Sequence, residues 1–428
     1  MTISSALIQK IESGAFDARF EKLYGDNVAA QRARYIDAVC GFVDTFGEPT
    51  SDLMLFSAPG RTEIGGNHTD HNNGRVLAGS VNLDVIAIVA VSNAPHIRVK
   101  SKGYDMDDID LSALTVVEEE YNRSSSLIRG TAARFAQLGY AIGGFDAYTT
   151  SNVLKGSGLS SSAAFEVLIG VILNHVYNDG KVSAVEIAQI AQYAENVFFG
   201  KPSGLMDQMA SSVGNIITID FKDTNNPIIE KVDFDFATTD HALCIVDVGG
   251  NHADLTHEYA AVPGEMKAIA ADMGVSVLRE TSLEAVLPRI PDLRKAHGDR
   301  AVLRALHFLY ENERVVDEVA ALKNGDFETF KKLVIASGNS SFQYLQNVYA
   351  ACNVSEQGMS LALALAQQVL DGKGAWRVHG GGFGGTTQNF VPTALLPAFI
   401  ELIESVFGKG SCHVLHIRPY GGVCVDKI

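Results

Sequence analysis

The chain has 428 residues with 46% hydrophobic and 20% charged side chains, which is the composition of a globular protein long enough for two domains with separate cores. The net charge of −16 argues against nucleic acid or an anionic membrane as a partner, the apolar run Val85–Val91 is too short to cross a bilayer, and the polar amino terminus does not resemble a signal peptide. Five cysteines without a C-x-x-C pair indicate reduced, mostly buried thiols, so we expect a cytoplasmic protein.

Apolar periodicity predicts helices and strands along most of the chain. In the first half we expect a helical lead-in over 3–46, strands at 53–58, 76–91, 96–101, 144–153 and 215–220, and helices at 125–139, around 167–173, at 183–199 and around 207. In the second half we expect strands at 242–248, 376–379, 386–391, 412–418 and 421–426, and helices at about 252–273, 300–322, 326–337, 355–371 and 393–407. Strands separated by helices in both halves predict an α+β fold with two layers that face one cleft. Charged and turn residues at 222–227 place the boundary between an amino-terminal domain (1–225) and a carboxyl-terminal domain (226–428).

A glycine- and serine-rich segment, Gly156–Phe165, precedes the apolar run Val167–Leu173. Glycine lets backbone N–H groups approach an anion closely, and the following helix N-terminus offers unpaired donors and the positive end of its dipole. The three serines at 160–162 can cap the helix, bind phosphate oxygens or reach a cation. The segment matches neither a Walker A loop nor a Gly-x-Gly-x-x-Gly turn, and a flexible linker is the alternative. Because it is nearly uncharged and leads directly into a buried helix, we interpret it as a phosphate-binding loop.

A second segment, Ala58–Gly74, is dense in glycine, asparagine, histidine and carboxylate side chains. This composition predicts a loop rather than a packing element, with hydrogen-bonding groups of the kind that bind sugar hydroxyls. His68, Asp70 and His71 are also potential metal ligands, but the segment lacks an H-E-x-x-H pattern and no distant third ligand stands out.

Two carboxylates and a second glycine loop are ambiguous when each is taken alone. Glu195 lies in the last turns of the helix that ends at Phe199, where an exposed carboxylate is the ordinary alternative. Asp207 lies in the first turn or two of a short helix, where the helix dipole favours the ionised form. The glycine loop Gly380–Gly385 follows the short strand at 376–379.

Taken together and in this order, these segments resemble the GHMP kinase family, and within it the galactokinases. Gly60-Arg61…His68-Thr69-Asp70…Gly74 is similar to the galactokinase signature, Gly156–Ala164 to the phosphate loop of the wider family, and Gly380–Gly385 to its third motif. Glu195 and Met206-Asp207-Gln208 also resemble galactokinase. The resemblance implies an ATP-dependent sugar kinase that phosphorylates the 1-hydroxyl of galactose, with ATP and Mg²⁺ as cofactors. It also implies a two-domain GHMP kinase fold, with a ribosomal S5 domain 2-like amino-terminal domain, a ferredoxin-like carboxyl-terminal domain and the active site in the cleft between them.

The same resemblance implies roles for individual residues. Asp207 resembles the catalytic aspartate, which we expect to take the proton of the anomeric hydroxyl late, as the phosphoryl group moves. Arg61 resembles the residue that orients that hydroxyl and balances charge on the phosphoryl group, and Ser161 and Glu195 resemble the Mg²⁺ ligands. The expected sugar contacts are Asn67, His68, Asp70, Gly204 and Tyr259. The expected ATP contacts are Gly156, Ser157, Gly158, Leu159, Ser160, Ser161, Ser162 and Ala163.

The chain departs from the galactokinase pattern in two places. Asn67 stands where the pattern usually has a glutamate that contacts the hydroxymethyl end of the sugar, so we expect looser or different recognition at C6. The arginine pair that often follows the tyrosine corresponding to Tyr259 is missing. In addition, the sequence does not identify the aromatic side chains that would face the adenine.

Three alternatives stay open at this point. The first is a GHMP kinase for a related sugar, such as a C6-modified or N-acetylated galactose. The second is a sugar-sensing regulator without catalysis, which the intact phosphate loop and Asp207 argue against. The third is a metallohydrolase that uses His68 and His71. The expected partners are a small sugar and ATP, with no nucleic acid, no membrane and no obligatory protein partner.

Overall fold

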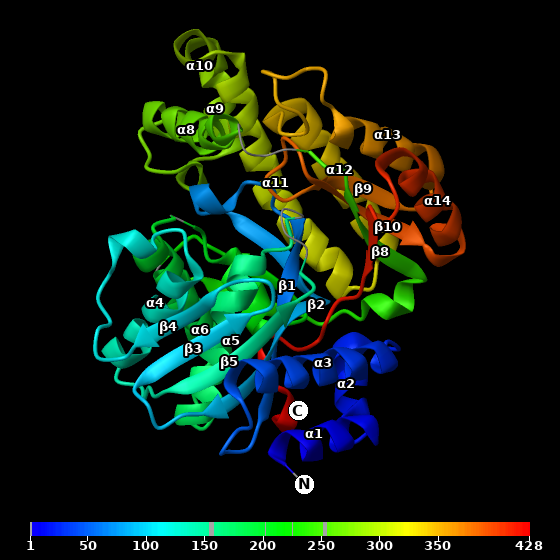
Figure 1. Cartoon of the computed structure of the whole chain (residues 1–428). Helices are drawn as coiled ribbons and strands as arrows, with labels where there is room; N and C mark the ends of the chain where they lie inside the picture. Colours follow the sequence, from blue (N-terminus) through cyan, green and yellow to red (C-terminus); the bar gives the residue numbers. More distant parts are fainter. Residues whose placement is uncertain (1, 154–157, 202, 225, 251–254) are drawn as a thin grey trace.

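The structure is a computed structural model that describes residues 2–153, 158–201, 203–224, 226–250 and 255–428. Two β-sheets, each covered by helices, form the framework of the molecule (Figure 1). This arrangement confirms the predicted α+β class. None of the helices within these ranges combines the length and the apolar character that crossing a membrane requires.

The larger sheet has eight strands in the described part of the chain, in the order β12-β1-β2-β5-β3-β4, with β6 paired to β2 and β7 to β6. The long strand β2 organises this sheet, because it pairs with β1 along most of its length, with β6 at its start and with β5 at its end. The strands are β1 (Met54–Gly65), β2 (Arg75–Val91), β3 (His96–Ser101), β4 (Met106–Asp110), β5 (Phe145–Ser151), β6 (Ile216–Asp220), β7 (Ile228–Val232) and β12 (Val423–Cys424).

Helices cover both faces of the larger sheet. Successive side chains of a strand point to opposite faces, so Ile86 and Ile88 pack against one helical layer and Val85 and Val89 against the other. The first layer consists of α1 (Ile3–Glu12), α2 (Asp17–Tyr24) and α3 (Val28–Phe46). The second layer consists of α4 (Ser124–Gln137), α5 (Ser161–Tyr177), α6 (Ala184–Tyr193) and, beside the start of β2, α7 (Met206–Val213).

The smaller sheet has the strand order β11-β8-β10-β9 and is antiparallel throughout. On β8, Cys244 and Val246 pack beneath α13 and α14, whereas Leu243 and Ile245 join the core of the larger sheet together with residues of α12. The two sheets therefore share one continuous core. The elements are β8 (His241–Asp247), α12 (Phe327–Ser340), α13 (Gly358–Leu370), β9 (Ala375–His379), β10 (Thr386–Pro392), α14 (Leu396–Phe407) and β11 (Cys412–Leu415).

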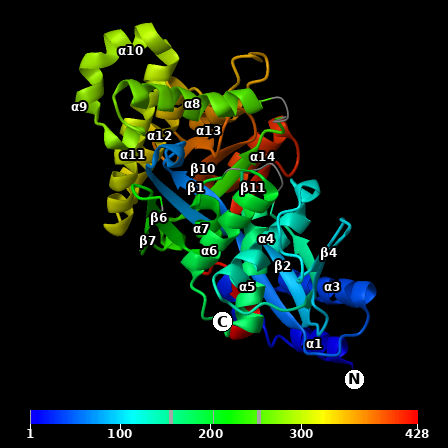
Figure 2. The ribbon, with the colours of Figure 1, turned by 90° about the vertical axis from the view of Figure 1, so that its left-hand side faces the viewer.

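A group of helices between β8 and β9 extends the molecule at the end opposite to the two termini (Figures 1 and 2). Its core contains apolar side chains from α8, α10 and α11. The longest of these helices, α11, also packs against α12 and contacts the larger sheet through β2. The helices are α8 (Thr256–Asp272), α9 (Leu283–Val286), α10 (Ile290–His297) and α11 (Asp299–Lys323).

The structure corrects the prediction for residues 58–65. β1 continues to Gly65, so the first half of the segment predicted as a loop is a buried strand. The strand was not predicted because Arg61 and Glu63 are charged, and charged residues are rarely buried unless they are paired. In the structure both are buried and paired. Near the carboxyl end, the predicted strand 421–426 is reduced to the two residues of β12. β7 and β12 follow residue 226 but pair with the larger sheet, and the boundary at residue 225 stays a prediction.

Candidate active site

An arginine–aspartate pair lies where β1 meets the first turn of α7. Arg61 Nε donates to Asp207 Oδ1 at 2.7 Å, and Nη2 lies at the same distance from that oxygen. The Asp207 side chain is 34% exposed, whereas that of Arg61 is 8% exposed, so the carboxylate reaches the surface and the guanidinium supports it from below. Asp207 lies in the first turn of α7, at the positive end of the helix dipole. This arrangement suits a carboxylate that accepts a proton from a substrate hydroxyl.

The glycine–serine loop contacts the same pair. Arg61 Nη1 donates to the carbonyl oxygen of Gly158, and Ser160 Oγ donates to Asp207 Oδ2. Ser160 precedes α5 with a φ of 57°, a left-handed conformation that costs a non-glycine residue about 1–3 kcal/mol and that clusters at functional sites. The predicted ATP contacts Gly156 and Ser157 lie outside the described residues, and the predicted contacts from Gly158 to Ala163 occupy the loop and the first turn of α5.

β1 approaches the loop closely, and this approach requires glycine at position 60. A Cβ atom there would lie 2.7 Å from the carbonyl oxygen of Leu159, closer than side chains tolerate. The next residue, Arg61, donates its backbone N–H to that same oxygen at 3.0 Å. The Gly60-Arg61 pair of the sequence motif therefore serves two purposes, because the glycine admits the loop and the arginine holds both the loop and Asp207.

A small cavity of about 200 Å³ opens beside Asp207, between β1, α7 and the second glycine loop. Charged and polar side chains dominate its lining. The residues that line it are Arg61, Glu63, His68, Asp70, Ser203, Gly204, Met206, Asp207, Gly380 and Gly381. Such a concave site with several converging hydrogen-bonding groups suits a small polyhydroxylated ligand.

Asp70 and Gly204 face each other across one side of this cavity. A Cβ atom at Gly204 would lie 2.6 Å from Asp70 Oδ2, so the carboxylate occupies the space that glycine leaves. Burial raises the pKa of Asp70, with a further contribution from the neighbouring charge of Asp207, while His68 opposes the shift. Two of the predicted sugar contacts thus lie together in the cavity, next to the predicted catalytic aspartate.

His68 connects the cavity to the second glycine loop. Its Nε2 donates to the carbonyl oxygen of Gly381 at 2.9 Å, so its Nδ1 is the acceptor for His71 Nε2 at 3.3 Å. His71 Nδ1 in turn accepts from Asn72 Nδ2 at 3.0 Å, and burial lowers the pKa of His71 well below its ordinary value. Both nitrogens of both rings are therefore used in hydrogen bonds. This geometry argues against the metal site and the metallohydrolase considered for His68 and His71.

Asn67, one of the expected sugar contacts, lies beneath the cavity rather than in its lining. Its side chain is fully buried and all four of its hydrogen-bonding positions are used. Nδ2 donates to Glu63 Oε1 (2.9 Å) and to the carbonyl oxygen of Gly380 (2.7 Å). Oδ1 accepts from Asn347 Nδ2 (2.9 Å) and from Ser341 Oγ (3.2 Å). No group of the Asn67 side chain is left for a sugar.

Tyr259 is also absent from the lining of the small cavity. Its hydroxyl donates to the carbonyl oxygen of Gly382 at 2.7 Å, and its ring meets Phe383 edge-on with the centroids 5.2 Å apart. A Cβ atom at Gly381 would lie 2.7 Å from the tyrosine ring. Tyr259 therefore supports the second glycine loop from α8.

Glu195 lies on a π-helical turn, Ala194–Phe199, a local deformation that is frequent at functional sites. Its carboxylate is 3% exposed and accepts from Ser203 Oγ (2.5 Å), Gln208 Nε2 (2.7 Å) and Lys201 Nζ (3.0 Å). Gln208 also donates to Glu166, whose Oε1 has no partner among the described residues. Burial and the neighbouring Glu195 raise the pKa of Glu166 well above its ordinary value. Carboxylate oxygens suit a hard cation, and Lys201 shows that Glu195 accepts a positive charge at this position.

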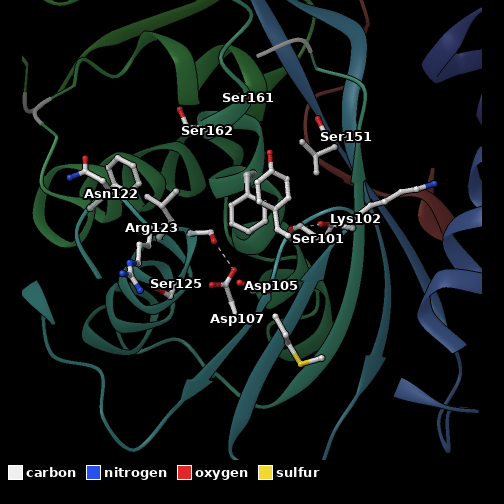
Figure 3. A pocket seen from close by; sticks show the side chains of 18 of the residues that line it. Ser101, Lys102, Asp105, Asp107, Asn122, Arg123, Ser125, Ser151, Ser161 and Ser162 are labelled. Atoms are coloured by element: carbon white, nitrogen blue, oxygen red, sulfur yellow. Dashed lines mark hydrogen bonds between the residues drawn. The ribbon is translucent and has the colours of Figure 1, made fainter. Parts of the chain in front are cut away.

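A larger cavity of about 990 Å³ lies on the other side of the serine run. Ser161 and Ser162 lie on one side of it, with Arg123 and Asp107 on another (Figure 3). Apolar and aromatic side chains contribute much of the remaining lining, and these are Val85, Tyr104, Met106, Leu127, Val153, Phe165 and Phe199. Tyr104, in the turn between β3 and β4, was not among the predicted site residues.

Comparison with known proteins agrees with this geometry. Residues 126–215 match the family model of the GHMP kinases N terminal domain, and residues 41–91 match the galactokinase galactose-binding signature. The chain is 30% identical to the galactokinase of Streptomyces coelicolor over 385 residues, which are 87% of this chain and 94% of the relative. The chain belongs to the galactokinase family. It is also 27% identical to the galactokinase of Clostridium tetani, over 86% of this chain and 91% of the relative.

Solved structures confirm the fold expected for a galactokinase-family protein. The structure of Lactococcus lactis galactokinase complexed with galactose superposes with a TM-score of 0.75 at 25% identity, covering 90% of this chain and 98% of the other. Methanococcus jannaschii mevalonate kinase shares the fold, with a TM-score of 0.61 at 14% identity over 86% of this chain and 99% of the other. The predicted GHMP kinase fold and the predicted enzyme class, an ATP-dependent kinase, are both confirmed.

Proposed function

We propose that this protein transfers the γ-phosphoryl group of ATP to the 1-hydroxyl of galactose, giving galactose 1-phosphate and ADP. The observation that carries the proposal is the run of three serines between the two cavities. Ser161 and Ser162 line the larger cavity, while Ser160 donates to Asp207, which lines the smaller one. A nucleotide in the larger cavity would therefore direct its phosphates, along the N-terminus of α5, toward a sugar in the smaller cavity.

Asp207 and Arg61 supply the chemistry at the point where the two cavities meet. The sugar O1–H proton passes to the Asp207 carboxylate as O1 forms its bond to the γ-phosphorus, and the bond from phosphorus to the bridging oxygen of ADP breaks with its electrons left on ADP. Arg61 holds the carboxylate at 2.7 Å and places a fixed positive charge beside the transferring group. Positioning and charge neutralisation are the main requirements of phosphoryl transfer.

We propose Ser161 and Glu195 as ligands of Mg²⁺. When bound, the ion would neutralise phosphate charge. Ser203, Gln208 and Lys201 hold the Glu195 carboxylate in place, and the Lys201 side chain is 59% exposed, so it can leave that carboxylate for solvent. Asp70, Gly204 and His68 are proposed as sugar contacts, and His68 Nε2 would exchange the carbonyl oxygen of Gly381 for a sugar hydroxyl when the sugar binds. Gly158 to Ala163 are proposed as ATP contacts, while Asn67 and Tyr259 act as supports of the site.

The proposal extends to two properties of the whole chain. We propose that residues 1–225 and 226–428 are its two domains, with the active site between them. We also propose that the enzyme is cytoplasmic, which the five free cysteines support, three of which are buried.

A panel of monosaccharides with ATP and Mg²⁺ tests the proposed reaction, scored by ADP release and by the ³¹P NMR spectrum of the product. Galactose should give the highest kcat/KM, with phosphate on O1. Preference for a C6-modified or N-acetylated galactose would show that this related sugar, and not galactose, is the substrate. Absence of turnover with every sugar would refute the proposal.

A further inference from the structure

Glu63 is a buried carboxylate whose two oxygens have different surroundings. Oε1 accepts from Arg377 Nη2 at 2.7 Å and from Asn67 Nδ2 at 2.9 Å. No residue in the described ranges donates to Oε2, and that atom is not enclosed by the protein. Because Glu63 follows Arg61 by two positions on β1, both side chains emerge on the same face of the strand, and both line the small cavity.

The surroundings of Glu63 fix this carboxylate in place. Arg377, on β9, is fully buried and also donates to the carbonyl oxygens of Ile64 and Val378. Gln388, on β10, donates to the backbone carbonyl of Glu63 at 2.9 Å. Burial raises the pKa of Glu63, and Arg377 and Arg61 oppose that shift. A carboxylate held by a buried arginine and an amide, with one oxygen open to a cavity, is prepared to accept a hydrogen bond from a ligand.

Asn67 supplies a neutral hydrogen-bond donor next to the Glu63 carboxylate. Its amide nitrogen donates to Glu63, so a carboxylate at position 67 would face a like charge and the carbonyl oxygen of Gly380. The carboxylate of this part of the site is therefore on Glu63, whereas the galactokinase pattern has an acidic group at position 67.

We infer that Glu63 determines sugar specificity, with its Oε2 accepting a hydrogen bond from a sugar hydroxyl other than the 1-hydroxyl at Asp207. This inference rests on the proposed function and deepens it. It also implies that recognition of the sugar depends on both sheets, because the partner that fixes Glu63 comes from the smaller sheet.

Steady-state kinetics of the full chain carrying Glu63→Gln test the inference. The amide keeps the shape but removes the charged acceptor, so the KM for galactose should rise about 10- to 100-fold while the KM for ATP stays within about twofold. The matched control is Glu265→Gln. Glu265 is a carboxylate on α8 that also pairs with a buried arginine, Arg304, and it lines neither cavity, so its replacement should leave the KM for galactose unchanged.

Monodeoxy galactoses, lacking the hydroxyl at C2, C3, C4 or C6, identify the group that Glu63 binds. The native enzyme should discriminate against each, and Glu63→Gln should lose discrimination at one position only. Should Glu63→Gln not fold, Glu63→Asp keeps the charge beside Arg377, withdraws the acceptor by one methylene and should raise the KM for galactose. An unchanged KM for galactose and unchanged discrimination in a folded variant would overturn the inference. Failure of the native enzyme to phosphorylate galactose would instead overturn the proposed function.

Discussion

The two cavities of this protein differ in what builds them. Among the described residues, the larger one is lined by elements of the larger sheet and its helices, with serines, aromatic side chains and six charged side chains spread over about 990 Å³. The smaller one lies where the two sheets meet, and Arg61, Glu63, Asp70 and Asp207 bring four charged side chains into about 200 Å³. If the proposed function holds, nucleotide binding is a local property of one layer, whereas sugar binding and proton transfer require both sheets.

The largest effect is expected from Asp207→Asn, which removes the proton acceptor and keeps the size of the side chain. We expect kcat to fall by about 10²–10⁴-fold, with little change in the affinity for galactose. ADP release measures the first quantity and calorimetric titration with galactose the second. Full activity of the variant would show that Asp207 is not the base.

Arg61→Ala tests the side chain that links the glycine–serine loop to Asp207. Its loss removes the positive charge beside the phosphoryl group and frees the Gly158 carbonyl, so kcat should fall by about 10²–10³-fold. The KM values for galactose and ATP should change less than kcat does. Arg75→Ala is a control, because Arg75 is an ion-paired arginine on β2 that lies outside both cavities.

Acid should destabilise the fold beneath the small cavity. His307, on α11, donates from Nε2 to the carbonyl oxygen of Asn67, and burial lowers its pKa to about 4. Between pH 6.5 and 4, His307 is protonated in the unfolded chain but stays neutral in the folded chain. The free energy of unfolding should therefore fall by about 3 kcal/mol over this pH range.

Denaturant titrations at several pH values measure this loss of stability. His307→Gln should flatten the dependence of the unfolding free energy in that window. An equally steep dependence in the variant would assign the effect to other groups.

The smallest effect is expected in the larger cavity, from Tyr104→Ala. Tyr104 is 53% exposed, so its removal should cost little stability, but the loss of an aromatic surface for the purine should raise the KM for ATP about 3- to 10-fold. The KM for galactose should not change. Tyr310→Ala, at an exposed aromatic side chain of α11 outside both cavities, is the matched control. An equal effect of both variants on the KM for ATP would show that the nucleotide does not bind in this cavity.

The sequence motifs predicted much of the region where the cavities meet. Arg61, the serine run and Asp207 occur in segments with recognisable glycine and capping patterns, and the structure brings them together. Most strands and helices were also predictable, because their apolar side chains repeat with clear periods, as along β2.

The supports of the small cavity could not be predicted in the same way. The burial of Asn67 depends on Ser341 and Asn347, and that of Glu63 on Arg377, all of which follow about 300 residues later. Glu63 itself had a local signal, since it shares a strand face with Arg61, but its charge made the segment resemble a loop. The aromatic lining of the larger cavity was not predicted because it comes from three separate parts of the chain, with Tyr104 in the turn before β4, Phe165 on α5 and Phe199 at the end of the π-helical turn.

A crystal structure with galactose, Mg²⁺ and a non-hydrolysable ATP analogue tests most directly whether the two cavities serve one reaction. We expect the galactose 1-hydroxyl within hydrogen-bonding distance of Asp207, the phosphates at the N-terminus of α5 and the purine in the larger cavity. A sugar bound outside the small cavity, or a nucleotide whose γ-phosphate points away from Asp207, would contradict that expectation.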